Sequence, residues 1–218
     1  MAESVLELSG VTAGYGPAEV LFGVDLSLHR GEVAALMGRN GAGKSTTLKA
    51  IMRLVTPSSG QVLFDGRDLG DLQPYQVARL GLGYVPEDRR IFTDLTVAEN
   101  LEVGRQPPRA AAPTWSDEKL FELFPALAAL RRRRGSRMSG GEQQMLCIAR
   151  TLAGNPTAIL LDEPSEGLAP VVVEQVGRAI VELKRAGVAV LLDEQNQQFT
   201  GRIADRTYVL ETGIMRSP

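Results

Sequence analysis

The chain has 218 residues, of which 44% are hydrophobic and 23% charged, and its formal net charge at pH 7 is −2. This length supports one sizeable hydrophobic core, and the composition excludes disordered, collagen-like and coiled-coil proteins. The balance of 24 basic against 26 acidic residues gives no global basic field, so we expect no nucleic-acid partner. No apolar run approaches the roughly 18 residues of a membrane-spanning helix, and the N-terminus lacks the basic region of a signal peptide.

Short strands are predicted at 4–8, 24–28 and 33–37, because the first two alternate between apolar and polar residues and the third is continuously apolar. After Gly43 the pattern becomes helical, with apolar residues at Leu48, Ile51, Met52 and Val55. The polar residues and proline of 56–60 end this helix, and a further strand is expected at 61–64.

The middle of the chain differs in character, since from about 87 to 155 we predict mainly helices, at 97–103, 117–124 and 141–153. The last part alternates again, with strands at 158–161, 188–192 and 207–210 and a helix at 171–186. Buried strands that alternate with helices indicate an α/β fold with a parallel sheet covered on both faces. We therefore expect a single domain, 1–218, with a core of 1–86 and 156–218 and a helical subdomain at 87–155.

The sequence GRNGAGKST at 38–46 fits the phosphate-binding pattern G-x-x-x-x-G-K-[ST], between an apolar strand and an amphipathic helix. Its glycines let backbone amides converge on an anion at the positive end of the helix. Lys44 is expected to reach the β- and γ-phosphates of ATP, and Ser45 to ligate Mg²⁺. A glycine turn that merely caps a helix is the alternative, but it has no need of these two side chains. The expected nucleotide-binding residues here are Gly38, Asn40, Gly41, Ala42, Gly43, Lys44, Ser45 and Thr46.

Two adjacent acids, Asp162 and Glu163, follow the predicted strand at 158–161. Because ligand sites of parallel sheets lie at the carboxyl ends of the strands, both carboxylates are expected near the phosphates. Asp162 would bind Mg²⁺, directly or through water, and Glu163 would orient or deprotonate the attacking water. The alternative is a pair of solvated acids in a loop.

Ser139-Gly140-Gly141-Glu142 opens a predicted helix and is typical of a capping box, in which Ser139 caps the helix and Glu142 reaches back. The two glycines exceed what a cap requires, and they would allow an anion to approach the backbone closely. The spacing alone leaves both interpretations open.

These motifs, in this order, resemble those of the ATP-binding subunits of ABC transporters: GRNGAGKST at 38–46, MSGGEQQ at 138–144 and ILLDEPSEGLAP at 159–170. The resemblance covers nearly the whole chain. Four further segments resemble LivF-type ATPases of branched-chain amino-acid importers: YVPEDRRIF at 84–92, LTVAENLEVG at 95–104, DEQN at 193–196 and YVLETG at 208–213. Related urea and amide importers carry similar motifs.

The resemblance implies a P-loop NTPase core with a mostly parallel sheet, an N-terminal antiparallel β part and an inserted helical subdomain. It also implies ATP and Mg²⁺ as cofactors. Tyr15 matches the aromatic residue that stacks on adenine. Ser139, Gly140 and Gly141 match the signature motif, which contacts the γ-phosphate bound to the opposite subunit of a head-to-tail dimer.

Implied partners are membrane permease subunits, docked near 87–92, and a second copy of this chain or a homologous ATPase subunit. A substrate-binding protein would be an indirect partner. The implied location is cytoplasmic, peripheral on the inner face of the cell membrane. Alternatives are another ABC transporter, for urea or amide import or for lipid export, and a soluble ABC ATPase that does not serve transport.

Three departures from the general family pattern concern the site. Glu87 stands where the family usually has a glutamine, although this is common in the LivF-like branch, and it could still approach Mg²⁺ and water. Gln195 stands at the position of the switch histidine; it can donate a hydrogen bond to the γ-phosphate but cannot become a cation. Asp193 adds an acid between the strand and Gln195, and we interpret it as a turn or helix-cap residue.

Overall fold

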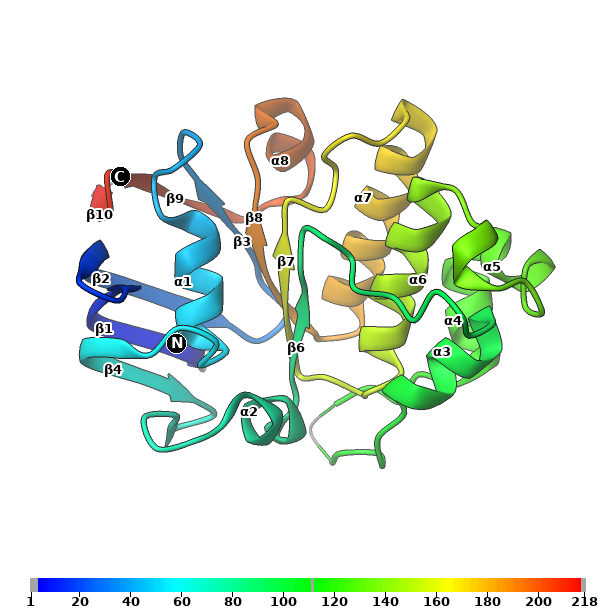
Figure 1. Ribbon diagram of the computed structural model, residues 1–218, viewed down its shortest axis with the longest axis horizontal. Coiled ribbons are helices and arrows are strands. Elements are labelled where there is room, and N and C mark those ends of the chain that lie inside the picture. Colours follow the sequence, from blue (N-terminus) through cyan, green and yellow to red (C-terminus); the bar gives the residue numbers. More distant parts are fainter. Residues whose placement is uncertain (1–3, 111, 217–218) are drawn as a thin grey trace.

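The fold is built on a six-stranded sheet that is parallel except at one edge (Figure 1). The computed structural model describes residues 4–110 and 112–216. The strand order is β10-β9-β3-β8-β7-β6, and β10 runs antiparallel to β9. The strands are β3 (Val33–Met37), β6 (Leu82–Val85), β7 (Ala158–Asp162), β8 (Ala189–Asp193), β9 (Arg206–Glu211) and β10 (Ile214–Arg216).

A second sheet, antiparallel and four-stranded, is formed by the N-terminal part of the chain. Its order is β2-β1-β4-β5, and β1 and β2 form a long hairpin that turns at Gly16-Pro17. The strands are β1 (Ser4–Tyr15), β2 (Ala18–His29), β4 (Pro57–Phe64) and β5 (Arg67–Asp68). The two sheets confirm the expected α/β class with its antiparallel N-terminal part.

The segment between β6 and β7 contains helices and no strand among its described residues. These helices are α3 (Val97–Gly104), α4 (Asp117–Leu123), α5 (Pro125–Ala129), the short 3-10 helix η1 (Gly135–Arg137) and α6 (Gly140–Leu152). Elsewhere lie α1 (Lys44–Ile51), α2 (Pro74–Leu80), α7 (Pro170–Arg185) and α8 (Gln197–Ile203). Within the described ranges, no helix combines the length and apolar character needed to cross a bilayer.

Alternation along β7 and β8 divides their apolar side chains between two hydrophobic clusters. Leu160 and Leu191 belong to a cluster with the antiparallel sheet and α1, whereas Leu161 and Leu192 belong to a cluster with α6 and α7. Successive side chains of a strand point to opposite faces, so the six-stranded sheet separates the two clusters. The continuous apolar runs of these strands are therefore required on both faces.

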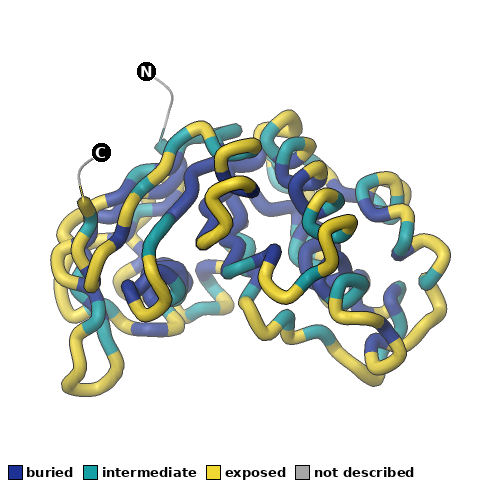
Figure 2. The backbone as a smooth tube through the Cα atoms, turned by 90° about the horizontal axis from the view of Figure 1, so that it is seen from above, coloured by how far each residue is buried: buried dark blue, intermediate teal, exposed yellow. Residues whose placement is uncertain are grey.

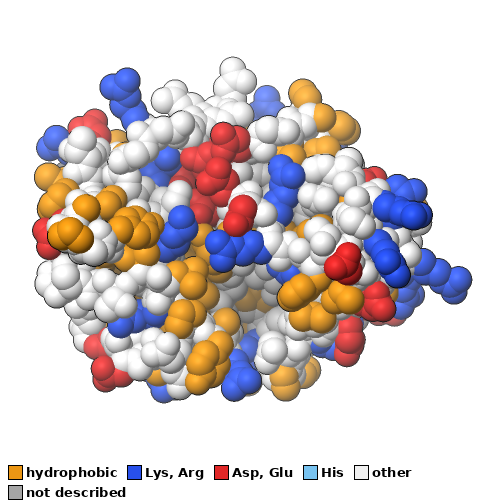
Figure 3. Space-filling model, viewed as in Figure 1, with side chains coloured by type: hydrophobic (Ala, Val, Ile, Leu, Met, Phe, Trp, Pro, Cys, Tyr) orange, Lys and Arg blue, Asp and Glu red, His pale blue; other side chains and the backbone are white. Residues whose placement is uncertain are grey.

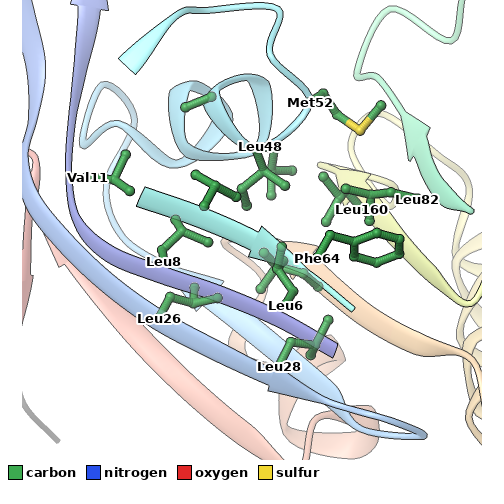
Figure 4. Packing of buried hydrophobic residues seen from close by; sticks show 14 of the residues in the cluster. Leu6, Leu8, Val11, Leu26, Leu28, Leu48, Met52, Phe64, Leu82 and Leu160 are labelled. Carbon is green, nitrogen blue, oxygen red and sulfur yellow. The ribbon is translucent and has the colours of Figure 1, made fainter. Parts of the chain in front are cut away.

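The phosphate-loop helix α1 is packed between the two sheets. Figure 4 shows Leu48 of α1 between Leu8 of the antiparallel sheet and Leu160 of the parallel sheet. Helix α6 lies on the other face of the six-stranded sheet, beside α7 (Figure 1). In Figure 2 the buried backbone runs through the middle of the molecule and the exposed segments lie around it. Because α1 is packed against both sheets, its position relative to them is fixed.

Several element boundaries differ from the sequence prediction. Strands β1 and β2 have 12 residues each, because the hairpin continues through glycine-containing irregularities that read as turns in the sequence. Helix α1 ends at Ile51, so Met52 and Val55 of its apolar pattern are buried beyond the helix. Strand β4 begins at Pro57, within the segment expected to be a turn. Helices α2, α5 and α8, with seven, five and seven residues, were not predicted.

A candidate site for nucleotide binding and hydrolysis

The loop at 38–43 connects β3 to α1 and depends on glycine at two close approaches. A Cβ on Gly38 would lie 2.4 Å from the carbonyl oxygen of Leu210 in β9. Gly43 has a φ of +107°, and a Cβ there would lie 2.8 Å from Cδ2 of Leu21 in β2. The loop thus packs closely against a strand of each sheet. It leads directly into the N-terminus of α1, where backbone amides can bind a phosphate.

Tyr15 lies at the end of the β1–β2 hairpin, with half of its surface exposed (51%). The same end of the hairpin reaches the phosphate loop, because Val20 and Leu21 of β2 contact the position of Gly43. An exposed aromatic ring beside the loop fits the expected stacking on a nucleotide base.

Because side chains alternate between the two faces of a strand, three polar side chains lie on the face that α1 covers. Tyr84, Asp162 and Asp193 each lie two residues after an apolar residue of the α1-side cluster, on β6, β7 and β8. The Tyr84 hydroxyl donates to Oδ2 of Asp162 at 2.8 Å. No donor among the described residues reaches Oδ1 of Asp162, which is 1% exposed as a residue.

Lys44 is buried at the centre of this group of acids. Its Nζ lies 3.4 Å from Oδ1 of Asp193 and 3.7 Å from Oε1 of Glu163. Beside it, the Ser45 hydroxyl donates to Oδ2 of Asp193 at 3.2 Å. Figure 3 shows acidic side chains gathered in the upper middle of the molecule, in the region where the parallel strands end. In this structure protein carboxylates therefore neutralise the phosphate-loop lysine.

Glu163 is held in a left-handed backbone conformation, with φ +45°. Non-glycine residues adopt this conformation at a cost of about 1–3 kcal/mol, and such strain is concentrated at functional sites. Gln195 Nε2 donates to Glu163 Oε1 at 2.7 Å. Burial raises the pKa of Glu163, but hydrogen bonds from Glu166 and Gln195 and the Lys44 ammonium outweigh it and leave the pKa below its usual value. Glu163 is therefore ionised and able to accept a proton.

Asp193 is neither a turn nor a cap residue, so that interpretation of the sequence is wrong. It is the last residue of β8 and fully buried, and the cap of α8 is Asn196, whose side chain accepts from Phe199 N. Burial raises the pKa of Asp193 to about 8, against the opposing effect of Lys44. The parity of β8 explains the placement, because Asp193 follows Leu191 by two residues and so shares its face.

Glu194, a residue that the sequence analysis passed over, organises the loops around Glu163. It is buried, and it accepts hydrogen bonds from Ser165 N at 3.1 Å and from the Ser165 hydroxyl. Its other oxygen accepts from Gln195 N and Asn196 N, each at 3.0 Å. The available signal was a repeated pattern, since β7 and β8 both end in an aspartate that is followed directly by a glutamate.

The start of α6 has the predicted capping box, with Glu142 N donating to the Ser139 side chain and Ser139 N donating to the Glu142 carboxylate. One of the two glycines also has a packing reason within the chain. A Cβ on Gly141 would lie 2.9 Å from Cγ2 of Val172, whereas one on Gly140 would meet only the flexible end of Arg89. Because α6 and α1 lie on opposite faces of the six-stranded sheet, this segment does not face the phosphate loop of its own chain.

Glu87 is exposed in the loop after β6, and no hydrogen bond or ion pair to the phosphate loop is found for it among the described residues. The hydrogen bond to Glu163 and the charge of that residue raise the pKa of Glu166 to about 7, and the charge of Glu87 makes a smaller contribution in the same direction. A hollow of about 1620 Å³ lies elsewhere, between α4, α7 and α8, and its described lining contains no phosphate-loop residue.

The residues present fit a magnesium ion. The described chain holds no group of three or more His, Cys, Asp or Glu arranged for a metal. Mg²⁺ in nucleotide sites, however, takes one or two carboxylates and completes its shell with phosphate oxygens and water. The free Oδ1 of Asp162 and the hydroxyl of Ser45 provide hard oxygen ligands of this kind.

A glycine loop between β3 and α1, with acids at the ends of β7 and β8, defines a nucleotide-binding protein of the P-loop class. The ABC transporter family matches residues 21–166. The chain therefore belongs to that family, and it is an ABC-type ATPase with the nucleotide-binding fold that the sequence predicts.

Individual relatives agree with this assignment. The high-affinity branched-chain amino-acid transport ATP-binding protein BraG of Pseudomonas aeruginosa is 41% identical, over 96% of this chain and 90% of its own length. The lipopolysaccharide export system ATP-binding protein LptB of Haemophilus influenzae is 34% identical, over 96% and 88%. The ADP conformation of an ATP-binding cassette of an ABC transporter superposes with a TM-score of 0.82 at 27% identity, covering 99% and 90%.

Proposed function

We propose that this chain is the ATP-hydrolysing subunit of an ABC importer for branched-chain or related small amino acids. In this proposal two ATPase subunits close head to tail on ATP and dock on a membrane permease from the cytoplasmic side. The placement of α1 and α6 on opposite faces of one sheet is the observation that carries the dimer. A capped helix start with two glycines has no phosphate to meet within its own chain, but it would meet one across a two-fold interface.

The chemistry follows from the residues around Lys44. The ammonium would exchange its acidic partners in the protein for β- and γ-phosphate oxygens. Ser45 and Asp162 would hold Mg²⁺, which would supply positive charge to neutralise the phosphates. Glu163 Oε1 accepts a proton from water as the water oxygen bonds to the γ-phosphorus. The bond from that phosphorus to the β–γ bridging oxygen breaks, and the electron pair leaves with ADP. Gln195 keeps the Glu163 carboxylate oriented during the transfer.

The signature segment acts on the opposite site. Ser139, Gly140 and Gly141 offer hydrogen-bond donors at the N-terminus of α6, where the helix dipole favours negative charge. Contact with the γ-phosphate would tie closure of the dimer to the presence of ATP and its opening to hydrolysis. This is a coupling between two sites, and therefore each ATP would also bind more tightly in the closed dimer.

A transported amino acid is favoured by the 41% identity with BraG over nearly the whole of both chains. Lipid export is the second candidate, and the 34% identity with LptB is the observation that favours it. Permease subunits from neighbouring genes would decide between them. Co-purified with the chain and placed in vesicles, they should support ATP-dependent uptake of radiolabelled leucine in the presence of a binding protein. Transport of a lipid instead would refute the importer assignment.

The hydrolysis mechanism is tested by Glu163→Gln and Lys44→Ala. Glu163→Gln should slow ATP turnover by about 100- to 10,000-fold, because the general base is lost. It should retain ATP binding and elute as a dimer with ATP on a sizing column. Lys44→Ala should abolish binding. Glu182→Gln, which changes an exposed acid of α7, is the matched control and should hydrolyse ATP as the wild type does. Normal turnover in Glu163→Gln would refute the assignment of the base.

A further inference from the structure

Asp193 places a buried carboxylate on the phosphate side of the sheet. The residue is 0% exposed, and its Oδ2 accepts from the Ser45 hydroxyl at 3.2 Å. No described donor makes a hydrogen bond to Oδ1, which faces the Lys44 ammonium at 3.4 Å. A buried carboxyl group needs partners that compensate for lost hydration, and Oδ1 has only this one contact.

Asp162 is the counterpart of Asp193 on the neighbouring strand. The two residues are paired in register at the ends of β7 and β8, and both side chains lie on the α1 face. Adjacent strands are about 4.8 Å apart, so the two carboxylates can reach one ion. Oδ1 of Asp162 also lacks a described hydrogen-bond donor. Two buried carboxyl oxygens therefore lie at neighbouring strand ends with no hydrogen-bond donor among the described residues, and Ser45 contacts the residue that carries one of them.

Acidic side chains outnumber basic ones at this point. Asp162, Asp193 and Glu163 contribute three carboxyl groups, and Lys44 is the ammonium that faces two of them. Arrival of a triphosphate adds further negative charge beside these acids. A divalent cation with hard oxygen ligands removes the conflict, since it binds carboxylates and phosphates together.

We propose that Asp193 is a second carboxylate of the Mg²⁺ site, which acts beside Asp162 and Ser45 when ATP binds; this rests on the proposed ATP-binding role of the loop at 38–46. The chain would then hold the metal by two strand ends rather than one. Nucleotide binding would depend on the metal more strongly than in a site with a single aspartate, because two side chains of the protein would hold the metal beside the phosphates.

A competing role for Asp193 is that of a counter-ion that only positions Lys44. In that case its removal would change the affinity for ATP by the same factor with and without metal. If Asp193 is a metal ligand, its removal should reduce the factor by which metal increases the affinity for ATP. The ratio of the two dissociation constants, in EDTA and in Mg²⁺, separates the two roles. Mg²⁺ binds free ATP equally in every sample, so differences in this ratio between variants report metal affinity inside the protein.

The test measures binding of a fluorescent ATP analogue to the full chain with EDTA, Mg²⁺ or Cd²⁺. In Asp193→Asn the ratio should fall about 10- to 100-fold from the wild-type value, a typical loss when a group of a metal site is removed. In Asp193→Cys, Mg²⁺ should increase the affinity for the analogue as little as it does in Asp193→Asn. Cd²⁺ should restore tight binding in Asp193→Cys, because a thiolate prefers soft cations. Asp205→Asn is the matched control, since it also removes an aspartate paired with a lysine, and should leave the ratio unchanged.

An unchanged ratio in Asp193→Asn overturns the proposal, and so does equal Cd²⁺ enhancement in Asp193→Asn and Asp193→Cys. If Asp193→Asn does not fold, the cadmium response of Asp193→Cys against the wild type decides. Wild-type protein that binds no ATP would refute the proposed function instead, so the two failures are distinguishable.

Discussion

Gln195 and Glu163 are joined by a hydrogen bond of 2.7 Å from the amide Nε2 to the carboxylate Oε1. The bond connects the loop after β8 to the residue after β7, and Glu163 N also donates to the carbonyl oxygen of Asp193. Glu163 is thus fixed by both its backbone and its side chain. A neutral amide can orient the carboxylate at every pH, because it has no proton to lose in the working range.

Replacement of Gln195 should reveal this orienting role. We expect Gln195→Ala to lower kcat about 10- to 100-fold, as for other groups that orient a reacting side chain, with little change in KM. Gln195→His should retain more activity and add a new inflection near the ordinary histidine pKa, about 6.5, to the pH profile of kcat. Steady-state hydrolysis from pH 5.5 to 9 checks both results. Wild-type kcat in Gln195→Ala would contradict the role.

Gly38→Ala should damage the phosphate loop sterically. The new methyl group would lie 2.4 Å from the backbone oxygen of Leu210, which cannot rotate away. We expect a loss of about 1–3 kcal/mol in the free energy of unfolding, as for other overpacked sites, together with weaker ATP binding. Urea denaturation and nucleotide titration measure the two effects.

The control for this substitution is Gly201→Ala. Gly201 lies in α8 with nothing within 4 Å of a new Cβ and no left-handed φ. The same chemical change should stabilise the protein there by about 0.5–1 kcal/mol, because alanine loses less backbone entropy in a helix. Equal destabilisation at both positions would show that the close contact at Gly38 is irrelevant.

Asn100 should be essential for the order of the segment between β6 and α3. This buried side chain accepts from Phe92 N at 2.9 Å and donates to the carbonyl oxygens of Phe92 and Thr96, each at 3.0 Å. Asn100→Ala leaves the Phe92 amide without its partner, at a cost of about 1–3 kcal/mol for an unsatisfied buried group, whereas the carbonyl oxygens of Phe92 and Thr96 still accept from Leu95 N and Asn100 N. We expect the Phe92 amide to lose protection from hydrogen exchange, whereas exchange in β8 remains slow. Retained protection at Phe92 would contradict this prediction.

Stability should depend on pH through Asp205. Burial raises the pKa of this carboxyl, but Lys184 and the Val33 amide outweigh it and the pKa lies below its usual value. A depressed pKa means that the contribution to stability is present above the unfolded pKa and is lost as the pH falls through the folded one. Asp205→Asn should therefore lower Tm at pH 7, and the difference should shrink towards pH 3. A difference that grows on acidification would reverse the assigned sign.

Motifs and apolar runs predicted the fold class and four strands of the six-stranded sheet, namely β3, β7, β8 and β9, because buried strands leave a strong signal in the sequence. The short strands β6 and β10 were not predicted from them. Short polar helices left no such signal: α8 has seven residues, of which Phe199 and Thr200 are buried, and its order comes from tertiary packing. The same limit applies to α2 and α5. Tertiary contacts override local preference most easily where an element has two turns or fewer.

The residues of the candidate site also fall into those that the sequence predicts and those that depend on tertiary structure. The phosphate loop and the Asp162-Glu163 pair could be predicted, because their residue types and spacing are specific to the chemistry. To predict that Asp193 is buried, the alternation of β8 side chains between the two faces would have to be extended by one residue beyond the apolar run. Glu194 required knowledge of a partner 29 positions away, Ser165, which no local pattern contains.

The pleat of β8 also limits how this protein can change. Deletion of one residue between Ala189 and Leu192 would turn the aspartate towards the helices α6 and α7 and send a leucine to Lys44. A point substitution in this strand alters the contacts of one side chain. An insertion or deletion of a single residue would move every following side chain of the strand to the opposite face of the sheet. The strand thus tolerates variation in side chains but not in length.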